Sequence, residues 1–83
     1  FVHIAHAVKI GKNTMIAGNT SVAGRVVVGS NTWIGPCVII SNGLTIGANS
    51  HIGIGSVVVS DVAENVKVFG NPARPYDRNK WYS

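Results

Sequence analysis

Aliphatic residues recur at every sixth position along most of the chain. Read in blocks of six from Ile4, ten successive blocks open with Ile or Val, without an insertion or a deletion. A period of six fits neither an α-helix, which repeats about every 3.6 residues, nor a strand, which alternates with a period of about 2. A fixed repeat of this kind is typical of a solenoid. The opening residues are Ile4, Ile10, Ile16, Val22, Val28, Ile34, Ile40, Ile46, Ile52 and Val58.

The other places of the hexad predict a short strand followed by a sharp corner. The fifth place is small or branched in every block, and it lies two residues before the next opening residue. Side chains two apart in a strand point to the same side, so these two places should face the interior. The fourth place is rich in residues that tolerate the left-handed backbone of a corner. These residues are Asn13, Asn19, Asn31, Gly43, Asn49, Gly55 and Asp61.

Three hexads make one triangular coil, because the chain turns by a third of a circle at each corner. The predicted fold is therefore all-β, a parallel β-helix with triangular coils that fill residues 1–62. Residues 63–83 should form a C-terminal cap and tail, because the phase of the repeat is lost at Ala63 and proline follows. The chain enters the repeat almost at once, and we expect it to be the C-terminal part of a longer protein. The expected coils are residues 4–21, 22–39 and 40–57, with 58–62 beginning a fourth.

The sixth place of each hexad should point away from the core and stack on its equivalent one coil later. Three outward stripes follow, and two of them are largely apolar or aromatic. Stacked apolar side chains on a surface indicate a protein interface. The stripes are Met15, Trp33 and His51 on one face, His3, Ser21, Ile39 and Val57 on a second, and Lys9, Val27 and Thr45 on the third.

Charge and cysteine content narrow the classes of partner. The formal net charge is +4, but the basic residues are dispersed, whereas nucleic-acid-binding proteins cluster them with aromatic side chains. One cysteine, Cys37, permits no internal disulfide, which fits a reducing cytosol, and we expect it to be a plain corner residue. There is no apolar run of about 18 residues and no signal-peptide pattern. We therefore expect a cytoplasmic protein with no membrane insertion and no nucleic-acid partner.

The hexad repeat resembles that of the bacterial hexapeptide-repeat acyltransferases, over about residues 1–74. The resemblance implies that the β-helix is left-handed, although parallel crossovers are ordinarily right-handed. It also implies a homotrimer with parallel helix axes and active sites between subunits.

A second resemblance concerns the run VHIAHAVKIG around His6. It is similar to the catalytic segment of UDP-3-O-acylglucosamine N-acyltransferases of the lipid A pathway, with Ala7 in place of an Asn, and to amino-sugar-nucleotide N-acetyltransferases. In both families this His is the general base, a role that suits a side chain with a pKa near neutrality. The resemblance also implies that Gly24, one coil later, offers its N–H to the oxyanion. Asn42, a further coil on, and His3 are candidate substrate contacts.

The ending DVAENVKVFGNPAR resembles that of coenzyme A-dependent hexapeptide acetyltransferases, with Ala63 in place of a Pro. In that family the loop flanks the pantetheine and the nucleotide end of the cofactor. Gly70, Asn71 and Pro72 suit a tight turn, and Arg74 can pair with a phosphate. The cofactor-binding residues implied are Gly70, Asn71, Pro72 and Arg74.

These features predict an acyltransferase that moves an acyl group from a coenzyme A or acyl-carrier-protein thioester to an amino sugar. The acceptor would be a sugar nucleotide used in surface polysaccharide or lipopolysaccharide synthesis. No permanently bound cofactor and no metal are expected.

The alternatives are O-acetylation of a sugar or small alcohol and a non-catalytic trimerisation module. The metal-dependent carbonic anhydrase version of this fold needs three converging histidines, and His51 should lie far from His3 and His6. As structural alternatives, His6 and Gly24 would be ordinary corner residues and the GNPAR loop a cap.

Overall fold

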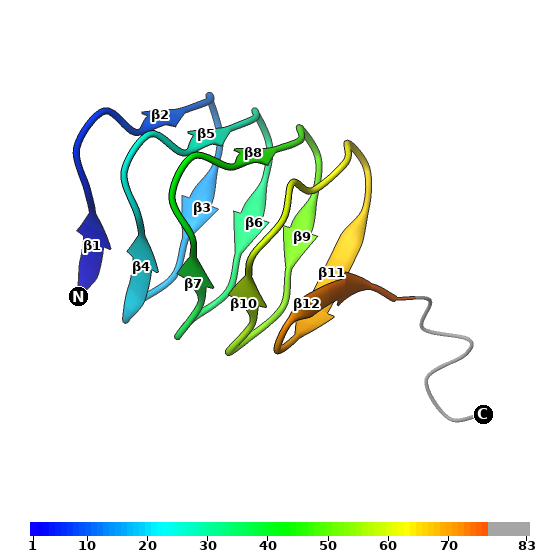
Figure 1. The fold of residues 1–83 in the computed structure, drawn as a ribbon. Helices are drawn as coiled ribbons and strands as arrows, with labels where there is room; N and C mark the ends of the chain where they lie inside the picture. The colour runs from blue at the N-terminus through cyan, green and yellow to red at the C-terminus, as the bar shows by residue number, and fades with distance from the viewer. Residues whose placement is uncertain (77–83) are drawn as a thin grey trace.

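The computed structural model describes residues 1–76, which wind into about four turns of a left-handed parallel β-helix (Figure 1). This confirms the all-β fold predicted from the hexads. Short strands form the sides of a triangular prism and two-residue turns form its corners. Successive coils stack along the axis of the prism. A position on one coil therefore lies beside its equivalent on the next.

Three parallel sheets make up the sides of the prism. The first contains β1 (Val2–Ile4), β4 (Thr20–Val22), β7 (Ile39–Ile40) and β10 (Val57–Val58). The second contains β2 (Lys9–Ile10), β5 (Val27–Val28) and β8 (Thr45–Ile46). The third contains β3 (Met15–Ile16), β6 (Trp33–Ile34), β9 (His51–Ile52) and β11 (Lys67–Gly70), followed by the antiparallel strand β12 (Ala73–Pro75).

The register between strands confirms the three outward stripes. Met15 pairs with Trp33 and Trp33 with His51. The other two stripes keep the same spacing of one coil. On the first sheet His3 pairs with Ser21, Ser21 with Ile39 and Ile39 with Val57, and on the second Lys9 pairs with Val27 and Val27 with Thr45.

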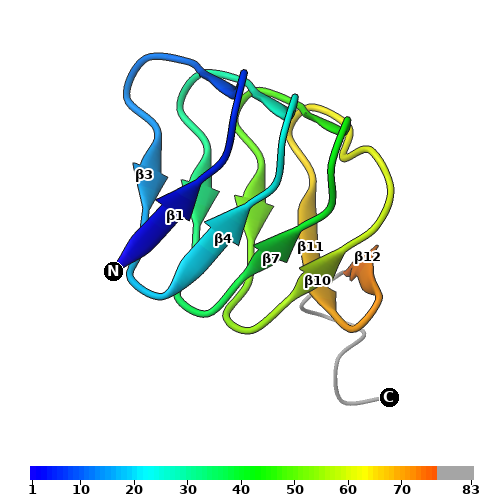
Figure 2. The same ribbon diagram turned by 60° about the vertical axis from the view of Figure 1, so that its left-hand side comes forward.

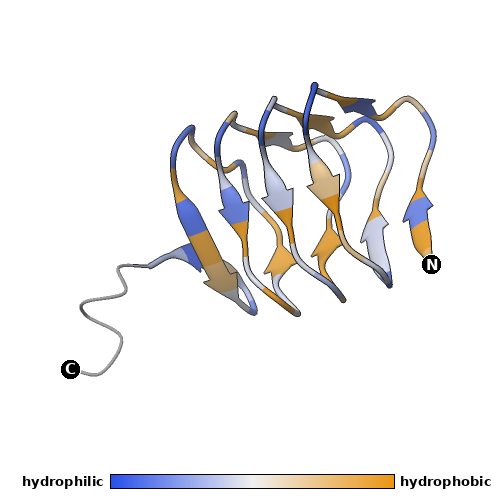
Figure 3. Cartoon of the chain, turned by 180° about the vertical axis from the view of Figure 1, so that it is seen from behind, coloured by the Kyte–Doolittle hydropathy of each residue, from blue (hydrophilic) through white to orange (hydrophobic). Residues whose placement is uncertain are grey.

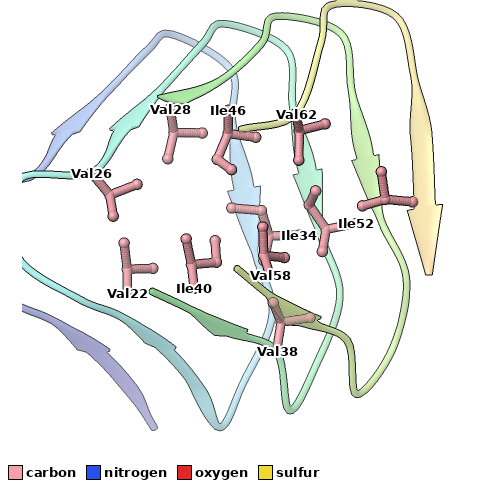
Figure 4. Packing of buried hydrophobic residues seen from close by; sticks show 11 residues of the cluster. Val22, Val26, Val28, Ile34, Val38, Ile40, Ile46, Ile52, Val58 and Val62 are labelled. Carbon is pink, nitrogen blue, oxygen red and sulfur yellow. The ribbon is translucent and has the colours of Figure 1, made fainter. Parts of the chain in front are cut away.

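The core is the inward stack of opening and fifth-place aliphatics (Figure 4). The opening residues of the second and later coils are almost completely buried, whereas Ile4 and Ile10 are 44% and 39% exposed. These two lie in the first described coil, which has a neighbouring coil on one side only. Burial of each coil thus depends on the next. The core residues are Val22, Val26, Val28, Ile34, Val38, Ile40, Ile46, Ile52, Val58, Val62 and Val68.

Buried hydroxyl groups at the fifth place link neighbouring coils. Thr20 Oγ1 donates to the Gly35 carbonyl at 2.8 Å, and Thr32 Oγ1 reaches the Gly47 carbonyl at 3.2 Å. Both hydroxyls have a second partner as well, since Thr32 Oγ1 also lies 3.0 Å from the Gly29 carbonyl and Thr20 Oγ1 accepts from Val38 N–H at 3.3 Å, so these buried polar groups are satisfied. Ser50, the equivalent of Thr32 one coil later, has a buried Oγ without a partner in residues 1–76.

The corners adopt the left-handed backbone that was predicted from the residue types at the fourth place of the hexad. The Asn and Gly residues there have φ between 57° and 73°. Ala7, Arg25 and Cys37 occupy the same place with φ of 59–60°. Asp61 was expected to do so as well, but it is absent from the positive-φ residues among the described positions.

Asp61 departs from the pattern because the fourth coil is two residues short. Val62 forms a parallel bridge with Ile46, whereas an unbroken repeat would bring Glu64 to that place. The chain therefore cuts across the corner, and in Figure 2 it turns away before reaching the line of the corners after β1, β4 and β7. The Asp61 carboxylate accepts a hydrogen bond from Thr45 N–H at 2.8 Å. In the preceding coils a backbone carbonyl accepts this bond.

The repeat resumes after the shortened coil. Val62 takes the opening place, Asn65 is a left-handed corner with φ of 59°, and Val68 is buried beside Ile52. The third sheet therefore has one more parallel strand, β11, than a repeat ending at Val62 would give. β11 begins at Lys67, within the segment that was expected to form a cap.

The hairpin of β11 and β12 ends the described structure. Phe69 pairs with Arg74, and a cis peptide bond joins Asn71 to Pro72 in the turn. Phe69 and Tyr76 contact each other edge to face, with ring centroids 6.1 Å apart. The aromatic residues Trp81 and Tyr82 are predicted from the sequence to cover the open end of the coil or to reach a neighbouring subunit, but residues 77–83 lie outside the described residues.

Gly29 shows how tightly the coils approach each other. A Cβ at this position would stand 2.7 Å from the Ala48 Cα on the next coil, whereas at Gly18 it would meet nothing closer than 3.9 Å. The backbone ladder fixes the spacing, so the clash cannot be relieved by a side-chain movement. We expect Gly29→Ala to cost about 3 kcal/mol and to lower the melting temperature by roughly 10–20 °C. In calorimetry Gly18→Ala should melt near the wild-type temperature, and equal melting of both variants would contradict this packing.

Candidate functional site

His6, Gly24 and Asn42 occupy the third place of one corner on three successive coils, as predicted. The corner lies between the first and second sheets. Arg25 N–H donates to the His6 carbonyl at 3.0 Å, and Gly43 N–H donates to the Gly24 carbonyl at 2.9 Å. His6 and Asn42 are exposed, and Gly24 is half-buried between them. The His6 side chain is therefore available to a ligand that lies along this corner.

Gly24 leaves an open N–H at the centre of this corner. Its amide donates no hydrogen bond within residues 1–76, although those of Ala23 and Arg25 on either side do. An added Cβ would meet only the His6 carbonyl oxygen, at 3.4 Å, which is ordinary contact. The packing of the chain thus does not itself require glycine here, in contrast to Gly29. The absence of a side chain keeps the amide accessible from outside.

The series of corner hydrogen bonds stops at Asn42. His6 and Gly24 each accept a bond from the next coil, but the Asn42 carbonyl accepts none within the described residues. The shortened fourth coil explains this, because it removes the residue that would donate. Asn42 therefore presents a backbone acceptor and a side-chain amide together. Both can bind a donor or acceptor group of a ligand.

No carboxylate lies near His6 along the chain. Residues 1–60 contain no Asp and no Glu, and Asp61 and Glu64 belong to the fourth coil. Asp61 is bonded to Thr45 N–H. His3 is exposed on β1, on the flat side of the first sheet, while His6 is at the corner. The groups of the His6 corner that can contact a ligand include the Gly24 amide, the Asn42 side chain and carbonyl, and the exposed Arg25 side chain.

The second candidate group lies at another corner. Gly70 ends β11 and is followed by Asn71 and Pro72, at the corner that also holds Cys37 and Gly55 from the coils before. Gly70 has φ of 106°, and its N–H donates to Ser56 Oγ at 3.3 Å. The turn is separated from His6 by one side of the prism and by three coil spacings of about 4.8 Å. One copy of the chain does not bring the GNPAR loop to His6.

An aromatic stack lies on the outer side of the third sheet, which faces the viewer in Figure 3. The rings of Trp33 and His51 are parallel within 30°, with centroids 4.3 Å apart. Trp33 lies over Gly35, where an added Cβ would be 3.0 Å from the indole. Partial burial, and secondly the positive charge of Lys67 beside it, lower the pKa of His51 from 6.5.

Two features of the site were missed by the sequence reasoning. Arg25 borders both His6 and Gly24 and was not singled out, although an Arg at a place usually held by Asn or Gly is a visible signal. The free Asn42 carbonyl depends on the shortened coil, which the sequence pattern did not reveal. Among residues 1–76 no three His, Cys, Asp or Glu side chains gather as metal ligands. In the same part of the chain no helix is long and apolar enough to cross a membrane.

The lowered pKa of His51 can be tested directly. An NMR titration of the imidazole should give a value below 6.5, and Lys67→Met should raise it because a repelling charge is lost. Lys12→Met, at a corner away from His51, is the control and should leave the pKa of His51 unchanged. The unfolded chain binds this proton more tightly than the folded one, so stability should fall as the pH drops below 6.5. A titration at or above 6.5 would contradict this environment.

No known family profile matches the chain. In sequence it is 37% identical over 79 residues to the acyl-[acyl-carrier-protein]–UDP-N-acetylglucosamine O-acyltransferase of Thiobacillus denitrificans. The match includes 95% of this chain but 31% of the relative. The chain thus spans about a third of the length of the curated relative that it matches.

Solved structures share the fold. Serine acetyltransferase of Neisseria gonorrhoeae is 30% identical, with a TM-score of 0.71, over 93% of this chain and 41% of its own. A hexapeptide-repeat acetyltransferase of Vibrio cholerae, complexed with acetyl coenzyme A, is 24% identical with a TM-score of 0.70, over 92% and 63%. PerB of Caulobacter crescentus, in complex with CoA and GDP-perosamine, is 22% identical with a TM-score of 0.70, over 92% and 54%. In fold and in sequence the chain resembles the hexapeptide-repeat acyltransferases, as its hexads and motifs predicted.

Proposed function

We propose that the protein is an acyltransferase that transfers an acyl group from a thioester to a sugar, with His6 as the general base. The observation that carries the proposal is the open Gly24 N–H beside the exposed His6 on adjacent coils. The similarity to hexapeptide-repeat acyltransferases over nearly the whole chain supports it.

In the proposed reaction the His6 imidazole accepts a proton from the acceptor amine or hydroxyl as it attacks the thioester carbonyl. Histidine is the side chain that most often serves as a general base in proteins. The carbonyl oxygen becomes an oxyanion, and the Gly24 N–H stabilises it because the amide is held by the backbone and has no other partner within residues 1–76. The carbon–sulfur bond then breaks, and the thiolate takes the proton held by His6. No covalent acyl-enzyme is formed.

The donor is proposed to be acyl-coenzyme A, with an acyl-carrier protein as the alternative, bound as a co-substrate. Structures similar in fold contain acetyl coenzyme A or CoA, and the exposed Arg74 suits a phosphate. The GNPAR loop lies at a different corner from His6, so we propose that two copies in a homotrimer supply the two parts of one site. Acyl-coenzyme A is a cytoplasmic metabolite, which supports a cytoplasmic location.

The acceptor is proposed to be an amino sugar carried on a nucleotide, with Asn42 and His3 as contacts. The structure of PerB was determined with a nucleotide sugar, GDP-perosamine. O-acylation is the second candidate, because the curated relative from Thiobacillus denitrificans is an O-acyltransferase. His6 would serve either acceptor in the same way.

The general-base role predicts the effect of removing the imidazole. His6→Ala should lower turnover by roughly 10²–10⁴-fold, because a positioned base contributes about this factor. The fold should be unaffected, because His6 is exposed and outside the aliphatic stack. Steady-state kinetics with a series of sugar-nucleotide acceptors, alongside the melting temperature, would measure both. His3→Ala should retain most of the activity, and a His6→Ala enzyme at the wild-type rate would overturn the assignment.

The homotrimer predicts that a charge on the apolar stripe of the first sheet will separate the subunits. Ile39 is 53% exposed in one copy, so Ile39→Glu should not disturb the coil itself. At a subunit contact it would bury an unpaired charge, at a cost of several kcal/mol. Sedimentation should therefore show a monomer for Ile39→Glu and a trimer for the control Asn31→Glu at an exposed corner. A wild-type protein that sediments as a monomer would contradict the proposal.

A further inference from the structure

Arg25 is held in a backbone conformation that its residue type does not favour. It occupies the fourth place of the corner with φ of 60°. At its own corner the equivalents of Arg25 are Ala7 and Gly43, and at the corner that follows β2, β5 and β8 they are Asn13, Asn31 and Asn49. Asparagine visits this region far more readily than arginine, which has a long side chain and no local hydrogen bond to offset the cost. Such strained positions gather at functional sites.

The Arg25 side chain contributes nothing to holding the chain together. It is exposed, and within residues 1–76 its guanidinium forms no ion pair and no hydrogen bond. Its backbone N–H bond to the His6 carbonyl would be formed by any residue except proline. Cys37, at another corner, forms the equivalent bond to Gly18 at 3.1 Å with φ of 59°. The fold therefore uses the Arg25 backbone and leaves its charged group free.

The first three coils form a positively charged body around this side chain. Residues 1–60 contain Lys9, Lys12 and Arg25 and no acidic residue, while Asp61 and Glu64 lie on the fourth coil. Lys9 follows the same corner one coil before Arg25. No carboxylate of these coils competes for the guanidinium, and an anionic ligand at this end would be attracted.

The position of Arg25 decides which substrate carries the anion. It directly follows Gly24, whose N–H is the proposed oxyanion donor, and its own N–H donates to the His6 carbonyl, so its exposed side chain starts at the proposed reaction centre and can reach a group bound there. The pantetheine arm separates the thioester from the phosphates of coenzyme A by much more than one side chain. An anion beside Gly24 must therefore belong to the acceptor.

We propose that Arg25 binds the anionic group of the acceptor, a phosphate or carboxylate attached to the sugar ring, and so selects charged sugars over neutral ones. This inference rests on the proposed acyl transfer at His6. The planar guanidinium can bind either group with two parallel hydrogen bonds, which fixes the orientation of the ring as well as its position. That orientation brings the amine or hydroxyl of the sugar to His6.

The experiment compares three variants in their binding of small probes by calorimetry. Arg25→Gly removes the guanidinium and suits the positive φ. Arg25→Lys keeps the positive charge but cannot form two parallel hydrogen bonds to one anion. Cys37→Gly, at the equivalent place of another corner, is the matched control. The probes are N-acetylglucosamine 1-phosphate, glucuronate and neutral N-acetylglucosamine. Melting temperatures are measured on the same samples.

We expect Arg25→Gly to weaken binding of one anionic probe by roughly ten- to a hundredfold, since one charge-assisted contact is lost. Arg25→Lys should fall between Arg25→Gly and wild type. Both glycine variants should melt at the wild-type temperature or a few degrees higher, because glycine removes the conformational cost.

If Arg25→Gly loses affinity for N-acetylglucosamine 1-phosphate alone, the acceptor is a sugar phosphate. If it loses affinity for glucuronate alone, the acceptor is a sugar acid. Unchanged or equally reduced binding of all three probes would overturn the inference, as would equal losses in the Cys37→Gly control.

Failure of this inference is separable from failure of the proposed function. If Arg25→Gly binds every probe normally while His6→Ala still abolishes turnover, acyl transfer stands and the acceptor anion is bound elsewhere. If His6→Ala turns over normally, the reaction assignment fails whatever Arg25 binds.

Discussion

Everything in this molecule depends on the hydrogen bonding of each coil to the next, at a step of three hexads that is shortened by two residues in the fourth coil. The ladder brings equivalent residues side by side, so each aliphatic side chain is buried by its own equivalents above and below. It also explains why Gly29 has no space for a side chain and why Thr20 finds a carbonyl one coil away. The corners are different, because the ladder uses their backbone but not their exposed side chains. Chemistry can vary there without a change of fold.

The sequence predicted most of the fold because a period of six leaves few alternatives. It failed at Val58–Val62, where the chain is two residues short. A valine at position 62 is compatible with the fifth place of the unbroken repeat and also with the opening place of the shifted repeat, so its residue type does not reveal the shift. The pairing of Val62 with Ile46 reveals it. The prediction that Asp61 is a left-handed corner residue was wrong for a related reason. Aspartate tolerates such a corner, but here its carboxylate accepts a hydrogen bond from Thr45 N–H.

The candidate site was partly predictable for the same reason. His6, Gly24 and Asn42 follow one another at intervals of three hexads, and the step of the ladder brings them to one corner. The open Gly24 amide and the unpaired Asn42 carbonyl could not be read from residue types, because they depend on which backbone groups find partners among the described residues. Arg25 looks like an ordinary surface arginine in the sequence. Its left-handed backbone and its place beside Gly24 set it apart in the structure.

The central claim is that one active site is built from two copies of the chain, with His6 from one and Arg74 from the other. Mixing two impaired variants, His6→Ala and Arg74→Ala, and reassembling them tests it most directly. Assayed at low donor concentration, neither variant alone should turn over appreciably. In randomly mixed trimers about one interface in four would combine an intact His6 with an intact Arg74, so a matching fraction of the wild-type rate should return. A mixture no more active than its components would show that the two residues do not serve one site across the interface.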